Sequence, residues 1–176
     1  MRSNFLPLGG SCLLALCSAL LTFPSGTTIT SSTPQPSSTD PWYTAPEGFE
    51  SKSPGEILRI RLAPGNTTTT ISNSSQAWNI LFRTTDSRQN PIFAVTTVFA
   101  PTKSNGTALL SYQIAYDSAS VDASPSYSLN SATDTGIEAA LGRGRHVNVP
   151  DYEGPLASFT AGLMSGYQPS IPSVLL

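Results

Sequence analysis

The chain has very few of the residues that most often carry chemistry. Its two cysteines, Cys12 and Cys17, both lie in an apolar N-terminal stretch, and its single histidine is His146. Without that stretch, thiol catalysis, disulfides and cysteine metal sites are excluded. One histidine cannot build a histidine-rich metal site. We therefore expect neither a metal nor a cofactor.

Charge is also scarce. Charged residues make up 11% of the 176 residues, and the formal net charge is −2, whereas an ordinary domain has about 25% charged residues. No basic patch with interleaved aromatic residues occurs, so nucleic acid is not an expected partner. Low charge combined with many Ser, Thr, Pro and Gly residues suits a secreted protein.

Residues 1–23 at the N-terminus are predicted to be a signal peptide. Arg2 precedes an almost wholly apolar or small run, FLPLGGSCLLALCSALL, at residues 5–21. This run is too short and too poorly flanked for a membrane span. The alternatives are a buried helix and a membrane anchor. The signal-peptide interpretation predicts an extracellular protein without a stable membrane span.

Residues 24–40 are rich in Ser, Thr and Pro and have too few apolar groups for a core. They are expected to form a disordered linker, after which a domain runs over residues 41–166. Three glycosylation acceptor sequences lie in polar stretches of that domain. They begin at Asn66, Asn73 and Asn105.

The first half of the domain has the pattern of antiparallel strands. Residues 57–62 (ILRIRL) alternate apolar side chains with Arg, as a half-buried strand does. Residues 77–85 and 93–100 are rich in β-branched and aromatic residues. The polar loop at residues 86–90 makes them a predicted hairpin.

The second half alternates strands with helices. Residues 108–115 (ALLSYQIA) predict a strand buried on both faces, and 132–142 a helix capped by Thr133 or Asp134. A short strand follows at 146–150, then a helix at 155–166. This order predicts an α/β fold with a parallel sheet.

Four segments together resemble the fungal secretory lipase family, the α/β-hydrolase group that includes Candida lipase A. They are DPWYTAPEGFESKSPGEILRIR, LFRTTDSRQNPIFAVTTVFAP, LLSYQIAYDSASVDASPSY and VNVPDYEGPLASFTAGLMSGY. The resemblance covers roughly residues 40–167. It implies an incomplete α/β-hydrolase fold: N-terminal antiparallel strands, then strand, helix, strand and helix, ending before the nucleophile elbow.

The resemblance assigns one catalytic position, Asp117. In an α/β-hydrolase, one oxyanion-hole N–H comes from the loop after the third strand of the fold, and residues 108–115 are placed to be that strand. In the family, the Asp of this loop is the oxyanion-hole residue, acting through its main-chain N–H. Taken from the residues alone, Asp117 would more often be a turn or capping residue.

The remaining catalytic groups of the family are not found. No G-x-S-x-G sequence occurs, and the nearest serine, Ser165, is placed in a helix. His146 stands where the family has sheet residues and is expected to be structural. Asp151 and Glu153 form a carboxylate pair at a strand-to-helix junction, where acids cap the helix.

The C-terminal residues 167–176 (YQPSIPSVLL) depart from the family pattern. Pro169 and Pro172 prevent the helix expected there, so this tail suggests a truncated form. The family often has a cysteine before the PSY sequence, but Ala123 and Ser124 stand there. Without the flanking strands, apolar surface would be exposed, so marginal stability and aggregation are expected.

Two functions follow as hypotheses. The first is a secreted triacylglycerol lipase by descent, with this chain inactive because it lacks the Ser, acid and His of the triad. The substrate of the complete family member would be a lipid ester. The alternative is a non-catalytic secreted glycoprotein or pseudo-enzyme. A carbohydrate-binding β module is a weaker third idea, because residues 132–142 predict a helix. Acyl preference and oligomeric state stay open.

Overall fold

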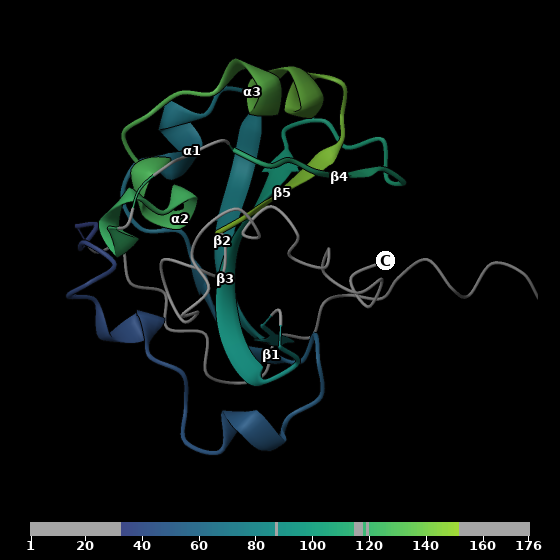
Figure 1. The fold of residues 1–176 in the computed structure, drawn as a ribbon. Coiled ribbons are helices and arrows are strands. Elements are labelled where there is room, and N and C mark those ends of the chain that lie inside the picture. Colours follow the sequence, from purple (N-terminus) through teal and green to yellow (C-terminus); the bar gives the residue numbers. More distant parts are fainter. Residues whose placement is uncertain (1–32, 87, 115–117, 119, 152–176) are drawn as a thin grey trace, which may run out of the picture.

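The structure is a computed structural model that describes residues 33–151, except residues 87, 115–117 and 119. Its centre is a five-stranded mixed sheet in the order β1-β2-β3-β5-β4. The strands are β1 (Ile57–Leu62), β2 (Ser74–Thr85), β3 (Pro91–Pro101), β4 (Leu109–Ser111) and β5 (His146–Pro150). Figure 1 shows the long β2–β3 ribbon curving through the middle of the molecule.

Six short helical elements accompany the sheet in the described part of the chain. In the upper half of Figure 1, three α-helices gather near one another. They are α1 (Thr67–Thr70), α2 (Pro125–Ser128) and α3 (Thr135–Gly142). The 3-10 helices are η1 (Pro41–Tyr43), η2 (Phe49–Ser51) and η3 (Val121–Ala123).

The predicted antiparallel half is confirmed. β1 has the predicted bounds, and β2 and β3 pair antiparallel over their whole length, from Ser74 opposite Pro101 to Thr85 opposite Pro91. At the turn, both carboxylate oxygens of Asp86 accept bonds from Asn90, which closes the polar loop. Side chains directly opposite each other on paired strands share a face. The pairing therefore fixes which residues form the core.

The strand–helix–strand unit is confirmed as well. β4 and β5 pair in parallel, with α3 between them in sequence. Asp134 caps α3, because its Oδ1 accepts the main-chain N–H of Gly136 at 2.9 Å and of Ile137 at 3.0 Å. Gly144, at φ 77°, takes the left-handed conformation that ends the helix.

One strand prediction is wrong. Residues 108–115 were expected to form a strand buried on both faces, but β4 has only three residues and Leu109 is 40% exposed. The reason is its place in the sheet: among the described strands, β4 pairs with β5 alone and lies at the edge. An edge strand does not need apolar cover on both faces.

The core lies mostly under α1 and α3. A cluster of nine buried side chains joins these helices to β2, β3 and β5. Its largest fully buried members are Phe99, Ile71, Ile137 and Leu141. A second, smaller cluster of Tyr43, Leu81 and Val95 lies under η1.

Candidate functional site

The carboxyl ends of β4 and β5 meet at one edge of the sheet, because the two strands run in parallel. In open α/β sheets, ligands bind at the carboxyl ends of the strands. The chain leaves β4 at Ser111, and Tyr112 still donates its main-chain N–H to the Asn148 oxygen at 2.8 Å. Asp117 lies further along this connection, outside the described residues. At the neighbouring strand end, β5 is followed directly by Asp151.

Asp151 is completely buried. Its Oδ1 accepts the main-chain N–H of Ser126 at 2.8 Å, and its Oδ2 lies 2.5 Å from the Ser126 hydroxyl. Its own main-chain N–H donates to the Val95 oxygen, which continues the pairing of β5 with β3. Burial raises the pKa of Asp151 to about 7, although the two bonds from Ser126 oppose the rise.

Tyr43 extends this hydrogen-bonded chain. Its hydroxyl lies 2.8 Å from the Ser126 hydroxyl, and its ring is buried in the smaller core cluster. Burial, and secondly the nearby Asp151, raise the pKa of the Tyr43 phenol. Asp151, Ser126 and Tyr43 therefore link the end of β5, α2 and η1.

Residues 37–44, which we name the strap, are held by two further contacts. The hydroxyls of Ser37 and Ser124 lie 3.0 Å apart in a buried position. At the surface, Asp122 accepts two bonds from Ser38, at 2.8 Å from the main-chain N–H and at 2.9 Å from the hydroxyl. The strap therefore bonds to both η3 and α2.

The strap is also anchored to β1 by Arg61. The guanidinium forms an ion pair with Asp40 at 2.6 Å and lies over the Trp42 ring at 4.2 Å from its centroid. Within the described part of the chain, its Nε and Nη2 and the Nδ2 of Asn79 are buried donors without a hydrogen-bond partner. The β1–β2 register places Arg61 opposite Asn79, so these donors lie on the strap-covered face.

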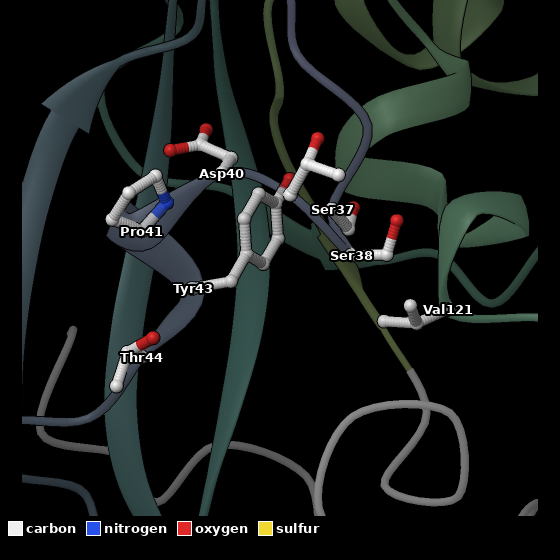
Figure 2. A pocket seen from close by; sticks show the side chains of 8 residues that line it. Ser37, Ser38, Asp40, Pro41, Tyr43, Thr44 and Val121 are labelled. Carbon is white, nitrogen blue, oxygen red and sulfur yellow. The ribbon is translucent and has the colours of Figure 1, made fainter.

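A hollow of about 420 Å³ lies along the strap. Apart from Val121 of η3, strap residues line it: Ser37, Ser38, Thr39, Asp40, Pro41, Tyr43 and Thr44. Figure 2 shows the Tyr43 ring standing among the strap side chains, with Val121 on the far side of the strap. The lining is mainly hydroxyl and carboxylate, which is a polar surface.

The other predicted positions fall in different places. Glu153 and Ser165, like Asp117, lie outside the described residues, as does the predicted helix at 155–166. His146 begins β5 and donates its main-chain N–H to the Ala108 oxygen, which fits the structural role expected of it. Asp151 was expected to be a helix cap. In the described residues its side chain bonds to Ser126 of α2 instead.

The three glycosylation candidates are all exposed. The Asn66 side chain makes no capping bond, although it precedes α1. Asn73 is more constrained, because its Nδ2 donates to the Glu138 oxygen at 3.2 Å. The Oδ1 of Asn105 accepts the main-chain N–H groups of Thr107 and Ala108.

Sequence reasoning missed Ser126 and Tyr43, and it placed part of the strap in a linker. A four-residue helix that starts with Pro125 has no periodicity to reveal it. The signal that was available is the PSY sequence, which formed part of the resemblance. Among the described residues, no helix has the length and apolar character needed to cross a bilayer, and no cluster of three metal-ligating side chains occurs.

Comparisons with known proteins place this arrangement among fungal ester hydrolases. No family model matches the chain. Trichothecene C-3 esterase of Fusarium sporotrichioides is 57% identical over 149 residues, which cover 78% of this chain and 33% of that protein. Lipase 9 of Candida albicans is 37% identical over 145 residues, with 76% and 32% covered.

The solved structure of Candida antarctica lipase A in its closed state is similar to this fold. The TM-score is 0.63 at 26% identity, over 74% of this chain and 33% of that chain. The chain thus spans about one third of the length of the relatives it matches. The shared part includes the mixed sheet whose carboxyl edge is described above.

Proposed function

The chain belongs to the fungal secretory lipase family, and from that premise we propose that it forms the oxyanion side of a secreted carboxylic-ester hydrolase. The sheet order carries this proposal. β5 lies between β3 and β4, and the loop that leaves β4 starts at the edge where α/β sheets bind ligands.

In this proposal, the main-chain N–H of Asp117 stabilises the oxygen that becomes negative when a serine attacks the ester carbonyl. One such donor contributes about 10²–10³ in kcat. The serine, the acid and the histidine come from polypeptide outside these 176 residues, since no G-x-S-x-G sequence occurs within them. In this proposal, the 176-residue chain by itself does not hydrolyse esters.

The ester class is better supported by one relative than by the others. The trichothecene C-3 esterase is 57% identical, against 37% for Lipase 9, over similar shares of this chain. We propose a trichothecene C-3 ester as the first candidate substrate and a triacylglycerol as the second. Comparing release of the trichothecene alcohol with release of fatty acid from tributyrin separates the two.

The oxyanion role is testable in a chimera. Residues 41–151 of this chain replace the aligned segment of the Fusarium esterase, and ester hydrolysis is measured. Asp117→Pro removes the N–H and should lower kcat by about 10²–10³. Asp117→Ala keeps the N–H and serves as the matched control, so it should lose far less.

Two results would contradict the proposal. Equal kcat for the Pro and Ala variants, with KM unchanged, would show that the N–H of residue 117 is not part of the oxyanion hole. Ester hydrolysis by the purified 176-residue chain would show that the nucleophile lies within it. If the chimera folds but has no activity, the alternative of a non-catalytic glycoprotein or pseudo-enzyme is favoured.

Secretion and glycosylation complete the proposal. Residues 1–23 act as the signal peptide and residues 41–166 as the lipase part before the tail at 167–176. The linker predicted over residues 24–40 ends before Ser37, where the strap begins. Asn66 and Asn105 are better glycan acceptors than Asn73, whose Nδ2 is engaged with the Glu138 oxygen. Mass analysis of the secreted protein before and after glycosidase treatment tests this.

A further inference from the structure

Three elements that are far apart in the sequence meet at one buried hydrogen-bonded chain. The phenol of Tyr43 in η1 lies 2.8 Å from the hydroxyl of Ser126 in α2, which in turn lies against the Asp151 carboxyl at the end of β5. Relative exposure is 6%, 6% and 0% for the three residues. Buried polar groups of this kind are stable only while their hydrogen bonds are kept.

The Asp151 carboxyl has no positive partner in the described part of the chain. Within the same residues, both hydrogen bonds to its side chain come from Ser126. Tyr43 is the titratable group that faces it from η1. Arg61 of β1 is paired with Asp40, and Asp122 of η3 is bonded to Ser38.

An ionised Asp151 would therefore be a buried charge with two hydrogen bonds and no counter-ion. Such a charge is costly unless water reaches it. Of the elements around it, the strap and α2 belong to no strand, and the Tyr43 hydroxyl joins the strap to Ser126. The sheet on the other side is held by the long β2–β3 ladder and by the pairing of β3 with β5.

We propose that Tyr43, Ser126 and Asp151 form a pH-operated latch, which holds the strap against α2 while Asp151 is protonated and releases it when Asp151 ionises. In the protonated state, the carboxyl donates to the Ser126 hydroxyl, which can donate to Tyr43. After ionisation, opening of the strap lets water solvate the carboxylate. Burial, which raises the pKa of Asp151 to about 7, agrees with a switch between acid and neutral pH.

Release of the strap would also remove the hollow that lies along it. All lining residues except Val121 belong to the strap, so the hollow exists only in the latched state. The exposed contact between Ser38 and Asp122 is a second attachment, which does not involve Asp151. The latch and this surface contact can therefore be separated by mutation.

Hydrogen exchange of the 176-residue chain, followed by mass spectrometry at pH 5 and pH 8, tests the latch. After correction for intrinsic rates, protection of peptides covering residues 37–44 should fall about tenfold or more between the two pH values. Peptides from the β2–β3 hairpin should keep their protection, and they serve as the internal control. Equal strap protection at both pH values would overturn the proposal.

Two variants test whether the pH dependence of strap protection comes from Asp151. Asp151→Asn imitates the protonated carboxyl, so strap protection should become independent of pH. Asp122→Asn makes the same chemical change at the surface contact, so the strap should loosen at both pH values and keep its pH dependence. A pH dependence that survives in Asp151→Asn would overturn the proposal.

A second measurement keeps the test decisive if Asp151→Asn does not fold. Tyr43→Phe removes the hydroxyl that joins the strap to Ser126, so the tenfold pH effect on strap protection should vanish. The protonated Asp151 should still give a carboxylic-acid C=O band in the infrared spectrum at pH 5. A strap that responds to pH as before in Tyr43→Phe would overturn the latch.

Discussion

The face of the sheet that carries the helices has two halves with opposite chemistry. Under α1 and α3 it is dry: Phe99, Ile137 and Leu141 belong to one apolar cluster with Val147 and Val149 of β5. Under the strap and α2, Asp151, Ser126 and Tyr43 form a buried polar network beside the smaller apolar cluster that Tyr43 makes with Leu81 and Val95. A single strand, β5, runs from one half into the other.

The two halves are expected to differ in how their contribution to stability depends on pH. Burying apolar surface stabilises the dry half at every pH, because no side chain of its apolar cluster is ionisable. Folding stabilises the polar half less, because its hydrogen bonds only replace bonds to water and because desolvating its carboxyl costs free energy. The dry half should therefore decide whether the chain folds, and the polar half should decide at which pH the fold is complete.

The largest expected effect is a loss of stability caused by a cavity in the dry half. Phe99→Ala leaves a cavity at a fully buried position and should lower the free energy of unfolding by about 3–5 kcal/mol. Urea denaturation followed by circular dichroism measures it. The loss should be the same at pH 5 and pH 8. Phe99→Leu, which leaves a smaller cavity, should cost less, and an equal cost would contradict the packing described.

The next effect belongs to the polar half and has a definite sign. In the folded protein the pKa of Asp151 is raised to about 7, whereas in the unfolded chain the pKa is near its ordinary value of 3.8. Between these values, the folded state binds more protons, so the free energy of unfolding falls as pH rises. The total fall attributable to Asp151 is at most about 4 kcal/mol.

The difference between the wild-type chain and Asp151→Asn isolates this contribution. Denaturation curves at pH 4, 5.5 and 7.5 should show the wild type losing stability relative to the variant as pH rises. A constant difference across that range would mean that Asp151 is not buried in the way described.

A smaller effect sharpens the comparison within the dry half. Asp134→Ala removes the cap of α3 and should cost about 1 kcal/mol. Asp134→Asn keeps an acceptor for the Gly136 and Ile137 N–H groups, so it should cost much less. Thermal melts of the two variants test this prediction. Identical melting temperatures for Asp134→Ala and Asp134→Asn would show that the Asp134 side chain does not cap α3.

The smallest effect lies at the sheet edge. Leu109→Thr replaces an apolar side chain that is 40% exposed, and the free energy of unfolding of the 176-residue chain should change by less than about 0.5 kcal/mol. The same measurement on Val147→Thr, at a fully buried position of β5 opposite Leu110, should give a clearly larger loss. Similar losses would show that Leu109 is covered in solution.

Regular elements were predictable where local pattern and tertiary role agree. The alternation at residues 57–62 gave the bounds of β1, and the hairpin pattern gave β2 and β3, because their periodicity reflects real differences between the two faces. The cap of α3 was predicted to be Thr133 or Asp134, and Asp134 is the residue that holds it. β4 was misjudged because composition does not reveal whether a strand lies at an edge.

The polar half could not be predicted in the same way. Ser126 and Tyr43 are separated by 83 residues, and Ser126 and Asp151 by 25. No local pattern links such positions, because the contacts depend on how α2 and the strap meet over β5. The sequence placed Asp151 directly after a strand, which is confirmed. The helix that it was predicted to cap lies outside the described residues, and the bonds that its carboxyl makes within them are long-range.

The position of β5 also sets an order of assembly during synthesis. β2 and β3 are adjacent in sequence and can pair as soon as both have left the ribosome. β4 is made before β5, yet among the described strands it can join the sheet only through β5. A nascent chain in which Ser111 has just emerged would therefore carry β1, β2 and β3 as a paired sheet and β4 as an unattached segment. Recruitment of that segment waits until residue 150 has emerged.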